Sequence, residues 1–209
     1  MNPTLLFYLF AFPLASLPIE DGSRFYAQSE GFWQTQQVEL GYARPEFSIS
    51  CSNTSYKSFQ QTTLHLGSHI ALSRHTHTYI APSLQRNSLL NRSYWRIGYR
   101  AMVSHRRENL LSAMHLEAQS WNNHPTILLR QCYIIDDQWS VWGGWRVENS
   151  TNSPLQFGGQ FRHNNLALHL WQQGPQTHIA TTFQAPHWEL SLHLSTLNPI
   201  TSQQFIFTP

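Results

Sequence analysis

Residues 95–104 read Trp-Arg-Ile-Gly-Tyr-Arg-Ala-Met-Val-Ser, and this stretch decides the fold. Apolar side chains occupy every second position, namely Trp95, Ile97, Tyr99, Ala101 and Val103. These apolar positions alternate with Arg96, Gly98, Arg100 and, after Val103, Ser104. Successive side chains of a β-strand point to opposite faces. The stretch therefore predicts a strand with one apolar and one polar face.

The same alternation recurs along the chain. It is clear in residues 139–148, 155–162 and 187–194, and weaker in residues 38–42, 47–51, 62–72, 110–120 and 177–183. Turn-forming residues separate these segments about every 10 to 15 residues, which predicts an all-β domain of about 12 strands (10–14) over residues 23–209. Residues 84–92 and 149–154 are expected to form longer loops.

The composition is unusual for a protein surrounded by water. Charged residues make up 11% of the chain, against about 25% in an average soluble domain. Lys57 is the only lysine, and twelve arginines carry the remaining basic charge. The formal net charge is +2 and the basic residues are scattered, which argues against a nucleic-acid partner.

Alternation of this kind fits two architectures. In a soluble periplasmic β-sandwich that binds a ligand, the apolar faces would pack against each other. In a transmembrane barrel, the apolar faces would meet lipid and the polar faces would line the lumen. Scarce lysine and aromatic residues placed near strand ends favour the barrel, because such aromatics form girdles at membrane interfaces. These aromatic residues are Trp33, Tyr94, Trp121, Trp139, Trp171 and Trp188.

The C-terminal segment 203–207, Gln-Gln-Phe-Ile-Phe, is a short strand with an aromatic residue near its end. It resembles the last strand of bacterial outer-membrane β-barrel proteins, whose pattern ends on an aromatic residue that the barrel-assembly machinery recognises. Phe207 is third from the end here, rather than last. The resemblance implies an antiparallel up-and-down barrel of the small porin-like class in the outer membrane of a Gram-negative bacterium, in contact with its lipid. It leaves the oligomeric state open.

The N-terminus reads as an export signal. Residues 5–16 form an apolar run that is too short to span a membrane as a helix. We therefore expect residues 1–16 to be a signal peptide.

The polar faces of the strands gather charged and histidine side chains. The predicted lumen or binding residues are Arg96, Arg100, Glu117, Arg146, Glu148, Arg162 and His169. One interpretation is an interior network of ion pairs that fills a narrow barrel, since buried charges need partners. The other is the lining of a small pore, which the arginine excess would bias weakly towards anions. Both give the barrel a structural, assembly or transport role.

A catalytic alternative rests on His193-Leu194-Ser195, which places a histidine and a serine on one strand face, with Glu189 on the same face. Barrel enzymes that cleave lipid or lipopolysaccharide esters use such a pair with a third group that orients the imidazole. Their motif continues with Asn, where this chain has Thr196. Alternation also places His193 on the polar face, away from lipid. We therefore favour a role other than catalysis.

Metal and disulfide chemistry have weak signals. His75 and His77 lie on one strand face, but a zinc site needs further ligands. We expect neither a metal nor a cofactor. Cys51 and Cys132 either form a disulfide in an oxidising compartment or remain as two small apolar residues, and the spacing allows both.

Overall fold

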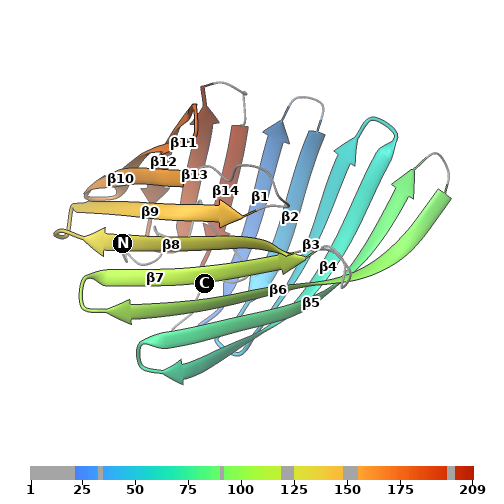
Figure 1. The fold of residues 1–209 in the computed structure, drawn as a ribbon, viewed down its shortest axis with the longest axis horizontal. Coiled ribbons are helices and arrows are strands. Elements are labelled where there is room, and N and C mark those ends of the chain that lie inside the picture. Colours follow the sequence, from blue (N-terminus) through green and yellow to red (C-terminus); the bar gives the residue numbers. More distant parts are fainter. Residues whose placement is uncertain (1–21, 33–34, 90–91, 119–124, 148–154, 197–200) are drawn as a thin grey trace.

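The computed structural model describes residues 22–32, 35–89, 92–118, 125–147, 155–196 and 201–209. In this part of the chain, 14 antiparallel strands close into one barrel (Figure 1). Each strand pairs with the next one along the chain, and β1 pairs with β14. The strands are β1 (Arg24–Phe32), β2 (Thr35–Ala43), β3 (Phe47–Tyr56), β4 (Phe59–Ser73), β5 (Thr76–Leu89), β6 (Arg92–Arg107), β7 (Leu110–Ala118), β8 (Thr126–Ile134), β9 (Trp139–Val147), β10 (Leu155–His163), β11 (Leu166–Gln173), β12 (Gln176–Gln184), β13 (Trp188–Ser195) and β14 (Thr201–Phe207).

The all-β up-and-down barrel predicted from the alternation is confirmed, with 14 strands against the expected 12 or so. The sandwich alternative is wrong, because no described strand is left as a free sheet edge. The loop expected over residues 84–92 is also wrong, since β5 continues to Leu89 and β6 begins at Arg92. The polar residues of this segment suggested a loop, yet Gln85 and Asn87 are buried on the inner face of β5.

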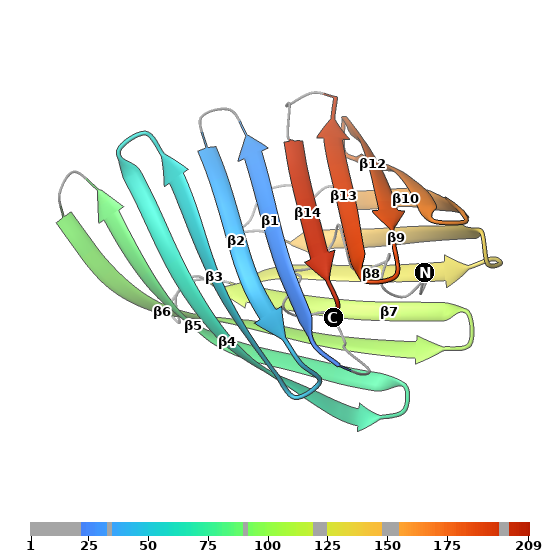
Figure 2. The same cartoon turned by 180° about the vertical axis from the view of Figure 1, so that it is seen from behind.

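The first strand, β1, begins at the same end of the barrel at which the last strand, β14, finishes (Figure 2). The connections at this end contain two to four residues. At the other end, the connections that follow β7, β9 and β13 are longer and span residues 119–125, 148–154 and 196–200. The other four connections at that end contain two residues each. Longer connections confined to one end are typical of outer-membrane barrels.

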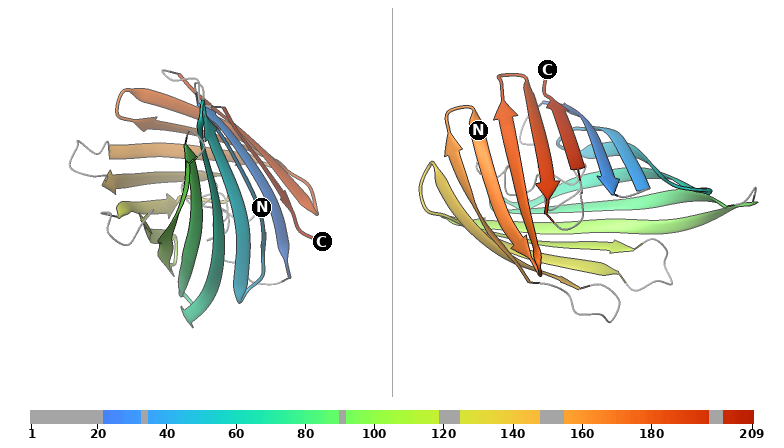
Figure 3. Two further views of the ribbon diagram at one scale, coloured as in Figure 1. Left: turned by 90° about the vertical axis from the view of Figure 1, so that its right-hand side faces the viewer. Right: turned by 90° about the horizontal axis from the view of Figure 1, so that it is seen from above.

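The outer face of the barrel is apolar. Leu40, Leu66, Ile97, Phe157 and Leu194 are each more than half exposed on it. The strands curve around a common interior (Figure 3). These side chains point away from that interior, so they form an apolar surface around the molecule. Trp139 and Trp188 begin β9 and β13 on this outer face, as predicted for a girdle. No helix of the described residues is long and apolar enough to cross a membrane.

The inner face is built from small and polar residues, with aromatic rings lying on glycines. A Cβ atom on Gly41 would come within 2.2 Å of the Tyr26 ring, and one on Gly67 would meet the Tyr79 ring at the same distance. Tyr26 and Tyr79 are almost fully buried. Glycine is therefore needed at both positions, because any side chain there would displace a ring from the inner wall.

Candidate functional site in the barrel interior

One charged residue from each of β2, β6 and β7 takes part in a paired network in the interior. Arg100 on β6 donates from Nε to Glu117 Oε1 on the adjacent β7 at 2.8 Å. Its Nη1 atom lies 3.8 Å from Glu39 Oε2 on β2. Strands β3, β4 and β5 separate β2 from β6 in the sheet. This second ion pair therefore joins two parts of the wall that are not neighbours.

Tyrosine hydroxyls extend this network. Tyr26 donates to Glu39 Oε1 at 3.3 Å, and Ser48 and Tyr79 form a hydrogen bond at 3.4 Å. Glu39 and Arg100 are both buried. Buried charges are tolerated when they are paired and hydrogen-bonded. Glu39 and Arg100 meet the pairing requirement through each other and through Glu117.

The opposite half of the wall has a different charge pattern. Strands β8 to β12 contain no aspartate or glutamate on either face. Their inner face carries Arg130, Arg146 and Arg162, together with His169 and His178. This part of the described wall is therefore basic, in contrast to the wall around Arg100, where Glu39 and Glu117 pair with the arginine.

Arg130 is the most deeply buried of these cations, with 5% of its surface exposed. Its Nη2 atom donates to Gln156 Oε1 at 2.9 Å. Its guanidinium lies 3.8 Å from the centre of the Trp142 ring, which is close contact for a cation on an aromatic face. Of the residues that the structure describes, no carboxylate forms an ion pair with Arg130.

An aromatic cluster continues along the wall from Trp142. The Trp142 and Trp171 rings are 6.3 Å apart between centroids. Gly158 lies between them in the sheet, and a Cβ there would come within 2.5 Å of Trp171 Cβ. Trp171 stacks on His178 at 4.9 Å and on His193 at 4.8 Å. Four rings from β9, β11, β12 and β13 thus form one surface on the inner wall.

The structure places most of the predicted lumen residues on the inner face. Arg100, Glu117, Arg146, Arg162 and His169 lie there by strand register. Arg96 has the same orientation but is exposed near the tip of the β5–β6 hairpin, where it lies over Tyr94. Glu148 falls outside the described residues. Arg100 and Glu117 are in direct contact, whereas the others are spread along different strands.

The weak catalytic candidates also lie on the inner face. His193 bonds His178, with 3.1 Å between ring nitrogens. Glu189 is four residues from His193, about 13 Å along an extended strand, so it cannot orient that imidazole. The Glu189 carboxylate and the Ser195 hydroxyl have no hydrogen-bond partner among the described residues. This geometry gives the lipid-hydrolase hypothesis no support.

His75 is exposed in the turn between β4 and β5, and His77 lies at the start of β5. No group of three or more potential ligands that could hold a metal ion is found among the described residues. The cysteines do not form the disulfide that their spacing allowed. Cys51 is exposed on the outer face of β3, and Cys132 is buried on the inner face of β8.

Sequence reasoning missed Arg130, Gln156, Glu39 and the inward position of Trp171. Trp171 was expected in an interfacial girdle, and that prediction is wrong because it is 6% exposed and faces inward. Leu166, Leu168 and Leu170 occupy the outer positions of β11, so strict alternation already places Trp171 inside. In β8 the alternation is weak, because Gln131 is polar on the outer face and Leu128 is apolar on the inner face, so it carried no clear signal for Arg130.

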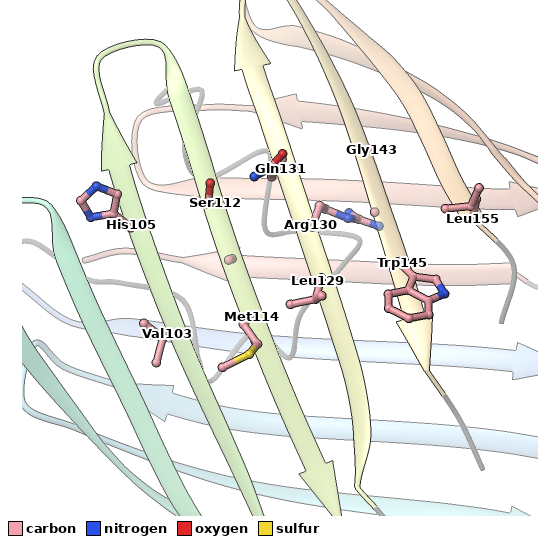
Figure 4. A pocket seen from close by; sticks show the side chains of 12 residues that line it. Val103, His105, Ser112, Met114, Leu129, Arg130, Gln131, Gly143, Trp145 and Leu155 are labelled. Atoms are coloured by element: carbon pink, nitrogen blue, oxygen red, sulfur yellow. The ribbon is translucent and has the colours of Figure 1, made fainter. Parts of the chain in front are cut away.

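A hollow of about 570 Å³ lies on the outer face over β6 to β10 (Figure 4). Its outward side chains include Val103, Met114, Leu129 and Trp145, and Gly143 leaves a gap between them. Figure 4 also shows the Arg130 side chain running from β8 toward β9. The hollow belongs mainly to the apolar outer surface, and it reaches Arg130 and Gly144 of the inner wall where the glycines leave the wall thin.

Comparison with solved structures finds similar barrels. The chain resembles the outer membrane protein Omp33 of Acinetobacter baumannii, with a TM-score of 0.56, 9% identity, and coverage of 90% of this chain and 98% of that one. The KdgM porin matches with a TM-score of 0.52 and 8% identity, over 89% of this chain and 99% of that one. The CymD monoaromatic hydrocarbon channel matches with a TM-score of 0.57 and 8% identity, over 91% of this chain and 89% of that one. No family model matches, and neither does any curated protein. The resemblance to outer-membrane barrels is confirmed for the fold.

Proposed function

We propose that this chain is an outer-membrane pore of a Gram-negative bacterium that passes small polar solutes and favours anions. The closed barrel with an apolar outer face supports a membrane location. The similar solved structures are outer-membrane proteins, porins and a channel by their names. Export by residues 1–16 and recognition of strand 203–207 by the assembly machinery belong to the same proposal.

The orientation follows from the connections. Outer-membrane barrels have short periplasmic turns and longer extracellular loops. The end with two- to four-residue turns, where β1 begins and β14 finishes, would face the periplasm. The end of the barrel where β7, β9 and β13 finish would then face the cell exterior.

The observation that carries the functional proposal is the basic inner wall of β8 to β12. These five consecutive strands carry arginines and histidines inside and no carboxylate at all. A wall of one charge sign attracts counter-ions and repels ions of its own sign. A pore along this wall would favour anions over cations of similar size.

A structural scaffold is the second candidate, because Arg100 and Glu39 join non-neighbouring strands across the interior. The two candidates differ in conductance. Purified protein reconstituted in planar lipid bilayers should produce discrete conductance steps if it is a pore. A barrel that inserts, and changes its gel migration on boiling, but gives no steps would instead be a scaffold.

Two variants then locate the conducting path. Arg146→Gln should reduce anion preference while leaving the barrel stable. Arg100→Gln should mainly destabilise the barrel, because Arg100 holds two glutamates. Identical ion preference in wild type and Arg146→Gln would contradict a path along the basic wall.

A further inference from the structure

The inner face of β8 carries a buried cation, Arg130, that forms no ion pair with a carboxylate of the described residues. Arg130 is as buried as Arg100, with 5% and 7% exposed. Arg100 contacts two carboxylates, whereas Arg130 contacts the neutral amide of Gln156 and the Trp142 ring. Arg100 is thus matched by carboxylates, as expected of an arginine that stabilises the fold, whereas these contacts of Arg130 are with neutral groups.

The local architecture holds the Arg130 side chain flat along the wall. Arg130, Gly144 and Gln156 are opposite one another on three adjacent strands. A Cβ on Gly144 would lie 3.6 Å from Arg130 Cβ and Cγ. Because Gly144 has no side chain, the arginine can cross β9 and reach Gln156 on β10. The guanidinium is thereby fixed by Gln156 at one nitrogen and by Trp142 below its plane.

Hydrogen-bonding capacity remains unused at this position. Arg130 Nε is buried and has no hydrogen-bond partner in the part of the chain that the structure describes. A guanidinium presents a planar fork of donors that matches a carboxylate in a bidentate pair. Buried donors without partners in a native protein call for an explanation, and a bound ligand is one of the ordinary ones. A carboxylate is the group that would satisfy both the charge and the unused donor.

An aromatic surface lies next to the guanidinium. Trp142 touches Arg130 on one side and approaches Trp171 on the other. Trp142 is only half-buried, whereas Arg130 beside it is covered. Flat rings stack favourably on indole in offset or tilted arrangements. The site therefore combines an anchor for an anion with a surface for a ring.

We propose that Arg130, Gln156 and Trp142 form a binding site in the barrel interior for a small organic anion in which a carboxylate is joined to a flat ring. The carboxylate pairs with Arg130, and the ring packs against Trp142. This inference deepens the proposed pore function by giving it a substrate class, and its role in transport rests on that function.

Benzoate is the probe, with acetate as the anion that lacks a ring and benzyl alcohol as the ring that lacks a charge. Two readouts are used on the intact barrel: block of the single-channel current, and quenching of tryptophan fluorescence in detergent. Benzoate should act at concentrations about tenfold lower than benzyl alcohol, since a charged hydrogen bond contributes on the order of 1.5–3 kcal/mol. It should also act at lower concentrations than acetate, which has no ring to pack against Trp142. Equal potency of benzoate and acetate would overturn the proposal.

Variants test the residues. Arg130→Gln should raise the half-saturating benzoate concentration about tenfold, and Arg130→Lys, which keeps the charge but loses the fork, should also weaken binding. Arg96→Gln is the matched control, because Arg96 also lies over an aromatic ring but at an exposed hairpin tip. Unchanged benzoate potency in Arg130→Gln and Arg130→Lys barrels would contradict the site. If Arg130→Gln does not form a barrel, the lysine variant and the wild-type comparison decide.

The two readouts separate the two proposals. Fluorescence quenching by benzoate without any conductance would support the site and contradict the pore. Conductance steps that benzoate affects no more than acetate, with no quenching, would support the pore and contradict the site.

Discussion

Replacing Arg100 with glutamine should destabilise the barrel more than any other single change to its charges. The substitution leaves Glu39 and Glu117 close to each other without their shared cation. Removing one partner of a buried ion pair typically costs about 3–5 kcal/mol, because the remaining charge is buried without compensation. Glu39 fits that case, since only 6% of its side chain is exposed.

The two ion pairs of Arg100, with Glu39 and with Glu117, should contribute unequally to the free energy of unfolding. The Arg100–Glu117 contact is shorter, at 2.8 Å, but the Glu117 side chain is 35% exposed. Solvent screens such a pair, and exposed ion pairs contribute about 0.2–1 kcal/mol. We therefore expect Glu117→Gln to cost about 1 kcal/mol. The buried Glu39 arm should account for most of the loss in Arg100→Gln, even though its atoms are 3.8 Å apart.

Urea unfolding of the barrel in lipid vesicles, followed by tryptophan fluorescence, measures these free energies. Arg96→Gln is the control, because Arg96 lies on the same strand and is exposed; surface changes of this kind are usually within about 0.5 kcal/mol. A double-mutant cycle of Arg100→Gln with Glu39→Gln isolates the interaction across the interior. A loss below about 1 kcal/mol for Arg100→Gln would refute the ion-pair reasoning.

Three further outcomes follow from the packing of the barrel. Gly67→Ala should lower the free energy of unfolding by about 1–3 kcal/mol, because its Cβ would overlap the Tyr79 ring. Gly143→Ala should leave the free energy of unfolding unchanged, since its Cβ meets nothing closer than 3.8 Å. Equal urea midpoints for the two variants would contradict this. Leu170→Arg on the lipid-facing side should cost about 2–4 kcal/mol if it lies at the bilayer centre, and Asp137→Arg in an exposed turn should not; similar losses in vesicle unfolding would argue against a lipid-facing outer surface. Cys51 should react with a lipid-soluble maleimide while Cys132 stays protected until unfolding, and a disulfide-linked band on a non-reducing gel would be inconsistent with their opposite faces.

Alternation was sufficient to predict the architecture because the outer face repeats one simple requirement. Segments such as residues 95–103 and 188–194 expose apolar side chains at every second position, and each was assigned to the correct face. Strand number was harder. In β1, Ala27 to Ser29 include no large apolar residue, and β5 contains Pro82, so both patterns are weak in sequence.

The interior site was only partly predictable, because alternation fixes the face of a residue and not its partner. Arg100 was predicted to face inward, yet its contact with Glu39 depends on how β2 and β6 approach across the barrel. Arg130 reaches Gln156 only because Gly144 leaves space between them. Such contacts join strands at long sequence separation, and a single sequence carries no signal for them.

The sign of the reversal potential shows directly whether the pore favours anions over cations. Wild-type protein in a planar bilayer would separate two potassium chloride solutions of different concentration. We predict a reversal potential of the sign set by chloride, reduced in Arg146→Gln and retained in Arg96→Gln. A reversal potential of the sign set by potassium would contradict a pore lined by the basic wall of β8 to β12.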